Sequence, residues 1–256
     1  MHVTYSDQDL ERYDLEMDRR VVVTGMGAVT PLGCTVDTFW EGLKNGKCGI
    51  DLIQKFDTTD FKVKVGAEVK DFDPELYMSK KDVKRNDPYA VYALAAAVQA
   101  FDDSGLDMEK EDAAKVGVIV GSGIGGLMTM QEQVIRLHEK GPSRVSPLFI
   151  PMTISNMAAG NIAIRLGAKG VCENIVTACA TGTNCIGTAF RDIKHGYLDA
   201  CIAGGAEASI SEIGVAGFTN LTALSTTEDP KDACKPFDKD RNGFVTVSYT
   251  HLTLPT

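Results

Sequence analysis

Short apolar runs alternate with helical patterns along this chain, and that alternation constrains its fold more than any other feature. Strand-like runs occupy residues 116–120, 175–177 and 199–203, and helical spacing recurs over residues 36–43, 89–101 and 126–137. Residues 21–23 predict a further buried strand that ends at the Gly-Met-Gly of residues 25–27, and the irregular residues 51–70 predict a hairpin-like excursion. Strands that alternate with helices are typical of the α/β class, which we therefore predict.

Cys179 lies where one of these runs meets a helix. Residues 174–177 are extended in type, and apolar side chains at helical spacing follow over residues 186–193. A helix N-terminus presents unpaired N–H groups and a partial positive charge, which favour a thiolate and can hold an oxyanion. Small residues on both sides of the cysteine leave room for a substrate carbonyl. The local sequence leaves two interpretations equally open, a nucleophilic thiol and a buried, inert cysteine.

Composition narrows the function classes. The 256 residues are 44% hydrophobic and 24% charged, a normal balance for a globular chain with a sizeable core. The formal charge of −9 argues against a nucleic acid or an anionic membrane as the main partner. No apolar run is long enough to cross a membrane, and residues 1–18 form a polar extension without a secretory signal, so the cytoplasm is expected. The seven cysteines include no Cys-x-x-Cys, so we predict neither a metal site nor a disulfide framework.

A glycine-rich segment offers a rival interpretation. Residues 121–126 read Gly-Ser-Gly-Ile-Gly-Gly after an apolar strand, which fits the G-x-G-x-x-G pattern of dinucleotide-binding oxidoreductases. That motif also needs a second parallel strand with an acidic residue about 20 positions further on. Here the helix leads instead into Gly-Pro-Ser-Arg-Val-Ser-Pro at residues 141–147. The dinucleotide site is therefore a remote alternative, and tight turning and close packing explain the glycines as well.

Five motifs in a fixed order make a more specific case. They are Val-Val-Val-Thr-Gly-Met-Gly at 21–27, the glycine-rich segment at 121–127, Val-Thr-Ala-Cys-Ala-Thr-Gly at 176–182, Ala-Gly-Gly-Ala-Glu at 203–207, and Pro-Phe-Asp-Lys-Asp-Arg-Asn-Gly-Phe-Val at 236–245. Together they resemble the β-ketoacyl-acyl-carrier-protein synthases, and among them the type II elongating enzymes of fatty acid biosynthesis. The likeness runs over residues 19–245, which we expect to be the N-terminal domain.

The resemblance implies a thiolase-like fold with α/β/α/β/α layers, of which this chain holds only the first half, assembled as a homodimer. It implies an acyltransferase without a cofactor, which joins an acyl group from its carrier protein to malonyl-carrier protein by decarboxylative Claisen condensation. Cys179 would carry the acyl group. Alternatives are a polyketide-type ketosynthase and a non-catalytic ketosynthase-like partner, although retention of the cysteine weighs against the latter.

Further residues take expected roles from the same resemblance. Ile124, Phe149 and Phe218 match positions along the acyl tunnel, with Phe149 reaching across the dimer interface, although a buried phenylalanine is more often plain core. The basic residues Lys81, Lys84 and Arg85 match positions that receive the acyl carrier protein. A solvated charged face is the ordinary alternative for them. Another basic position expected near Phe218 is occupied by Thr222.

Two departures from the family stand out. The family stabilises the enolate with a pair of histidines in His-Gly-Thr and Gly-His contexts, and none of the four histidines, His2, His138, His195 and His251, has such neighbours. After Val245 the likeness stops abruptly. Residues 246–256 are therefore expected to be foreign sequence from a truncated or chimeric gene, so that this fragment alone would be inactive. The alternating pattern of residues 247–254 leaves a genuine terminal strand as the other interpretation.

Overall fold

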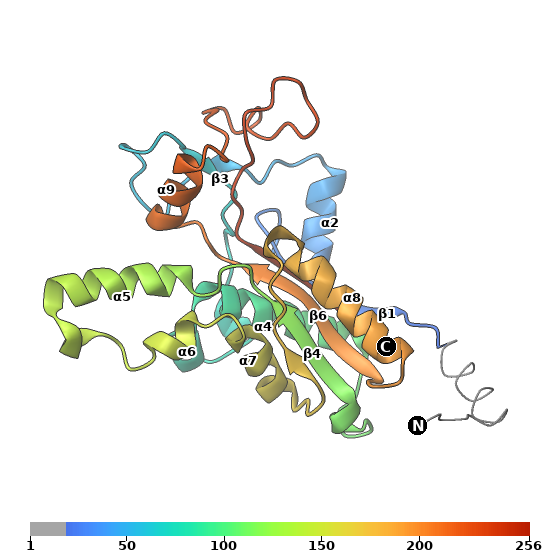
Figure 1. Ribbon diagram of the computed structural model, residues 1–256. Coiled ribbons are helices and arrows are strands. Elements are labelled where there is room, and N and C mark those ends of the chain that lie inside the picture. Colours follow the sequence, from blue (N-terminus) through green and yellow to red (C-terminus); the bar gives the residue numbers. More distant parts are fainter. Residues whose placement is uncertain (1–18) are drawn as a thin grey trace, which may run out of the picture.

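The computed structural model describes residues 19–256, so the predicted extension at residues 1–18 lies outside the described residues. A five-stranded sheet with the order β1-β7-β6-β4-β5 forms the centre (Figure 1). Its strands are β1 (Val23–Val29), β4 (Val116–Gly121), β5 (Cys172–Glu173), β6 (Ala200–Glu207) and β7 (Tyr249–Pro255). β4 runs parallel to β5 and β6, whereas β7 is antiparallel to β1 and β6. The predicted hairpin-like excursion is confirmed by the antiparallel pair β2 (Asp51–Leu52) and β3 (Val65–Gly66).

The predicted helices are confirmed and extend slightly beyond their expected ends. They are α2 (Val36–Lys44), α4 (Pro88–Ser104) and α5 (Leu127–Lys140). The remaining helices are α3 (Lys80–Val83), α6 (Phe149–Thr153), α7 (Met157–Leu166), α8 (Thr181–Lys194) and α9 (Glu212–Asn220). In the described part of the chain, no helix is both long and apolar enough to cross a membrane.

Helices cover both faces of the sheet. α4 and α7 pack on one face, where they bury Val118, Val120 and Ile202, and α8 packs on the other, against Ile119 and Cys201. Successive side chains of a strand point to opposite faces, so β4 and β6 must be apolar at almost every position. This requirement explains why their sequences predict strands clearly. The ends of β4 and β6, at Gly121 and Gly205, lie against the start of α8.

The first strand differs from its prediction. β1 runs through the glycines instead of ending at them, and Val22 and Val23 are 38% and 54% exposed rather than buried. The glycines are needed because α4 lies directly on the strand. A Cβ added at Gly25 or Gly27 would lie 2.0 Å from the Ala100 carbonyl oxygen or 1.9 Å from that of Ala96. Here glycine permits close packing of a helix and does not mark a strand end.

The strand expected at residues 175–177 is also displaced. β5 covers only Cys172–Glu173, and pairing with β4 stops there. The physical reason is Asn174, whose side-chain oxygen accepts a hydrogen bond from the Ser122 N–H at 3.2 Å. A side chain thus replaces the next bond of the ladder, and residues 175–177 leave the sheet as an extended lead into the turn of Cys179.

Candidate active site

Cys179 is exposed in a short 3₁₀ turn, Ala178–Ala180, directly before α8. The Thr177 N–H closes this turn by donating to the Thr181 hydroxyl oxygen at 2.9 Å. Ala178 has a φ of +50°, a left-handed conformation that residues with a side chain rarely adopt. The predicted placement of the cysteine at a helix start is therefore confirmed. No side chain caps the N-terminus of α8, so its first N–H groups have no side-chain acceptor at the cap.

A cavity of ≈ 400 Å³ opens beside Cys179, and Ile124 and Phe218 line it. Its walls also include the end of β6 and residues 244–247. Phe149 lies apart from them, half-buried in α6, and does not line this cavity. Thus two of the three expected acyl-pocket residues share a cavity with the thiol. Within residues 19–256, no histidine lines it.

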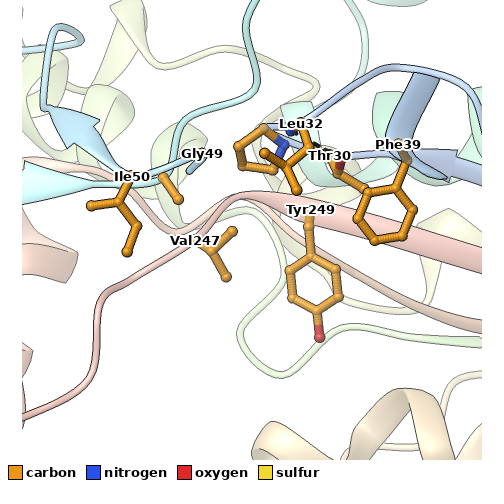
Figure 2. Close-up of a pocket in the computed structure, with 9 residues that line it drawn as sticks. Thr30, Leu32, Phe39, Gly49, Ile50, Val247 and Tyr249 are labelled. Atoms are coloured by element: carbon orange, nitrogen blue, oxygen red, sulfur yellow. Dashed lines mark hydrogen bonds between the residues drawn. The ribbon is translucent and has the colours of Figure 1, made fainter. Parts of the chain in front are cut away.

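A second, smaller cavity adjoins the first. It has a volume of ≈ 270 Å³ and is lined mainly by apolar side chains, including Leu32, Phe39 and Ile50 (Figure 2). Val247 and Tyr249 line both cavities, so the chain just before β7 and at its start separates them. Of the residues that line the second cavity, only Tyr249 is titratable.

The glycine loop, residues 121–126, has its backbone N–H groups satisfied from within the protein. Glu207, at the end of β6, accepts from the Ile124 N–H at 3.2 Å, and its other carboxylate oxygen lies 3.4 Å from the Ser122 hydroxyl. The same hydroxyl accepts from the Gly125 N–H at 2.9 Å. Burial raises the pKa of Glu207, and the surrounding backbone N–H donors lower it in part.

At the start of α5, a backbone N–H group likewise donates to an internal carboxylate. Asp87, which is 0% exposed, accepts from the Thr129 N–H at 2.9 Å and from the Tyr89 N–H at 3.2 Å. A dinucleotide pyrophosphate would need these loop and helix N–H groups for itself. Because Glu207 and Asp87 already accept from N–H groups of this loop and helix, the dinucleotide alternative does not fit here. The sequence did not point to Glu207, Asn174 or Asp87 as parts of the site.

Replacing Asp87 with Ala should lower the free energy of unfolding by about 2–4 kcal/mol, since a buried N-cap is lost and two buried N–H groups are left without an acceptor. Urea denaturation followed by circular dichroism measures the change. Asp112→Ala is the matched control, because Asp112 is exposed and, among the described residues, its side chain accepts only from the Ala114 N–H. Equal losses in the two variants would contradict the role assigned to Asp87.

The predicted basic residues lie together on the surface. Lys81 belongs to α3, Lys84 is its C-cap and Arg85 follows, and all three side chains are exposed. Ser79 caps α3: its hydroxyl oxygen accepts from the Asp82 N–H at 3.2 Å, and the hydroxyl donates to the Asp82 carboxylate at 2.7 Å. Among the described residues, Lys81, Lys84 and Arg85 form no ion pair, whereas Lys80 pairs with Glu75 at 3.3 Å. The cluster is thus free to meet an anionic partner.

Comparisons with known proteins agree on one family. Residues 18–247 match the N-terminal domain of the β-ketoacyl synthases. The chain is 49% identical over 228 residues to 3-oxoacyl-[acyl-carrier-protein] synthase 2 of Synechocystis sp., which covers 89% of this chain and 55% of that protein. The identity to the enzyme of the same name from Staphylococcus aureus is 46% over 231 residues, or 90% of this chain and 56% of that protein. The chain thus spans about half the length of these relatives.

Solved structures show the same fold. A ketosynthase of a type II polyketide synthase, bound to its acyl carrier protein and a hexaketide, superposes with a TM-score of 0.81 at 29% identity, over 93% of this chain and 58% of that one. A β-ketoacyl synthase from Burkholderia phymatum gives 0.81 at 28% identity, over 93% and 59%. The fold is thiolase-like, as predicted, and about three fifths of each solved chain is matched. The chain therefore belongs to the β-ketoacyl synthase family, whose N-terminal domain it contains.

Proposed function

We propose that the full-length protein is a 3-oxoacyl-[acyl-carrier-protein] synthase II of fatty acid biosynthesis, and that this chain is a truncated form of it. The observation that carries the proposal is Cys179, an exposed thiol at the start of α8 that opens into a cavity with Ile124 and Phe218. The relatives at 46–50% identity bear that enzyme's name. A solved polyketide ketosynthase matches at 29%, which favours the fatty acid enzyme over the polyketide alternative.

The proposed reaction has two stages. The Cys179 thiolate attacks the thioester carbonyl of acyl-carrier protein, the new carbon–sulfur bond forms, and the carrier's thiol leaves. Malonyl-carrier protein then loses CO₂, its enolate carbon attacks the acyl-cysteine carbonyl, and the Cys179 thiolate is released as the 3-oxoacyl product forms. A covalent intermediate divides one difficult step into two accessible ones. The N–H groups at the start of α8 support the first stage, since they can stabilise an oxyanion on the attacked carbonyl.

The second stage needs groups that stabilise an enolate, and within residues 19–256 no histidine lines the cavity. Enolate charge develops on the thioester oxygen, and fixed hydrogen-bond donors for such charge are commonly the largest catalytic contribution. In the described part of the chain, His138 lies in α5 and His195 at the end of α8, and neither lines the cavity. We propose that the second half of the protein supplies these donors, so that this chain alone does not catalyse condensation.

The last residues support the proposal that sequence from about Thr246 is foreign. Ser248 and Thr253 carry the only buried side-chain oxygens within residues 19–256 that lack a hydrogen-bond partner. Native cores seldom leave such groups unpaired. β7 nevertheless fills a central position, between β1 and β6. We propose that the native continuation of the chain forms this strand with better matched side chains.

Acyl carrier protein is the proposed partner, and the basic cluster Lys81, Lys84 and Arg85 is its proposed contact. One solved relative was determined with its acyl carrier protein, which supports this partner. The net charge of −9 repels an acidic protein globally, so a local basic surface is needed for binding.

Reversing all three charges, in Lys81→Glu, Lys84→Glu and Arg85→Glu together, should weaken carrier binding by about tenfold or more at low salt. It should also flatten the salt dependence, because surface attraction is screened over ~10 Å at 0.1 M. Titration of the full-length protein with labelled carrier protein at several salt concentrations measures both effects. The matched control reverses Lys47, Lys62 and Lys169, which are exposed elsewhere. Equal effects of the two triple variants would show that the cluster is an ordinary solvated surface and not the carrier contact.

A homodimer in the cytoplasm is the proposed state of the full-length protein. α5 and α6 extend from the body as an arm (Figure 1), and Val134, Ile135 and Ile150 on it are 56%, 45% and 60% exposed. β5 is an edge strand of the sheet, and Val176 just beyond it is 50% exposed. Exposed apolar side chains beside an open sheet edge favour an association interface. Phe149 lies on this arm, as a residue that reaches across such an interface should.

The function is tested by incubating the full-length protein with acyl- and malonyl-carrier protein and analysing the products by mass spectrometry. One condensation per turnover with release of CO₂ supports the fatty acid enzyme. Products of repeated condensation without reduction would favour the polyketide alternative. Absence of any acyl transfer would favour the non-catalytic partner.

A further inference from the structure

We infer that Glu207 is a positioning residue for the acyl chain: its carboxylate holds the glycine loop so that Ile124 stays in the wall of the cavity beside Cys179. The inference rests on the proposed function, since it concerns how that cavity receives an acyl group. Glu207 also lines the cavity, although it comes from β6 and the loop from the end of β4. No motif of the sequence connects the two, and 83 residues separate Glu207 from Ile124.

Apart from its hydrogen bond to Glu207, little fixes the position of Ile124. Its side chain is 42% exposed, and it lies between Gly123 and Gly125, of which Gly125 has a φ of +80°. Glycines leave a backbone free to adopt many conformations, so the loop is ordered by its hydrogen bonds rather than by packing of its own side chains. The bond that fixes Ile124 itself runs from its N–H to Glu207 at 3.2 Å.

The Ser122 hydroxyl connects Glu207 to a second backbone group of the loop. It lies 3.4 Å from Glu207 and accepts from the Gly125 N–H at 2.9 Å, so it connects the carboxylate to the residue after Ile124. The loop also approaches closely, since a Cβ added at Gly123 would lie 3.1 Å from the carboxylate oxygen. A larger residue at position 123 would push the loop away from this anchor.

The environment of Glu207 suits a carboxylate and not an amide. The surrounding N–H groups and the Ser122 hydroxyl are donors, and an ionised carboxylate only accepts. Glu207→Gln keeps the size of the side chain and one acceptor oxygen, but it replaces the charge and the second acceptor with an NH₂ group. The variant therefore weakens the anchor with little change in volume, and Ile124 should be held less firmly.

The test compares the full-length protein with its Glu207→Gln variant, using hexanoyl- and hexadecanoyl-carrier protein as donors and iodoacetamide as a small thiol reagent. We expect kcat/KM for hexadecanoyl transfer to Cys179 to fall about tenfold or more, the effect of losing one charge-assisted hydrogen bond. Hexanoyl transfer should fall less, and the rate of alkylation by iodoacetamide should change less than about twofold, because Cys179 is exposed. Glu109→Gln is the control, because Glu109 is exposed and remote from the loop.

A double-mutant cycle isolates the route through Ile124. If Glu207 acts by positioning Ile124, then Ile124→Ala alone should reproduce the loss for the long donor, and adding Glu207→Gln should cost no more than about twofold further. Additive losses, unchanged hexadecanoyl transfer, or equal losses for both donors and for iodoacetamide would each overturn the inference. Should Glu207→Gln lower the yield of folded protein, Ser122→Ala tests the same anchor and should show the same selectivity for the long donor.

Failure of the proposed function would give results that differ from failure of the role of Glu207 alone. The unsubstituted protein would then transfer neither donor to Cys179, and the inference would fail with it. If the unsubstituted protein transfers both donors and only the variants behave against expectation, the proposed function stands and the role of Glu207 is wrong.

Discussion

Replacing Cys179 with Ala in the full-length protein will abolish condensation, with a loss of about 10³-fold or more, because the acyl group then has no nucleophile to carry it. The rate of 3-oxoacyl product formation measures the loss. Cys172→Ala is the matched control, since Cys172 is also exposed but lies in β5, where burial and the neighbouring Glu173 raise the pKa of its thiol. We expect that variant to keep its rate within about twofold, as surface substitutions usually do.

The contrast between the two cysteines makes this prediction specific. Cys179 stands before α8 in a turn with strained backbone at Ala178, which is the kind of geometry that functional sites retain at a cost in stability. Loss of condensation in Cys172→Ala but not in Cys179→Ala would contradict the assignment.

A second large difference in condensation rate is expected between the 256-residue chain and the full-length protein. The 256-residue chain should show no measurable condensation, whereas the full-length protein should turn over at a rate of about 1 s⁻¹ or more, as enzymes commonly do. The reason is that, within residues 19–256, no histidine lines the Cys179 cavity to stabilise the enolate. A chain cut after Val245 should be inactive as well, because it lacks β7 from the middle of the sheet in addition to the second half of the protein.

The exposed surface of the chain agrees with this prediction. Phe190 on the outer side of α8 is 44% exposed, and Ile213 and Leu221 in and after α9 are 56% and 69% exposed. At roughly 25 cal/mol per Å² of apolar surface, covering a few hundred Å² would add several kcal/mol to the free energy of unfolding. The full-length protein should therefore also resist urea better than the fragment. Condensation by the 256-residue chain would show that the second half is not required.

Much of this architecture could be predicted from the sequence, because it depends on local pattern. The buried strands β4 and β6 are apolar on both faces, and Asp87 before Pro88 marks the start of α4. The turn at Cys179 follows from small residues before a helical repeat. The family resemblance, which depends on ordered motifs, is confirmed by the match over residues 18–247.

Other features depend on contacts between distant residues. The glycines of β1 suggested a strand end, but they serve the packing of α4, about 70 residues further along the chain. Asn174 ends the pairing of β5 by bonding Ser122, which is 52 residues away. Glu207 bonds the glycine loop at Ile124 across 83 residues, and no sequence periodicity indicates such a bond. The roles of Phe149 and of the basic cluster depend on partners that this chain does not include, so they stay predictions.

The role of Cys179 as the acyl-carrying nucleophile is tested most directly by locating the acyl group. The full-length protein is incubated with acyl-carrier protein, digested, and its peptides are mapped by mass spectrometry. We expect one acyl group in thioester linkage on Cys179, which hydroxylamine removes. An acyl group on Cys172 or Cys185 with none on Cys179, or no acylated peptide at all, would contradict it.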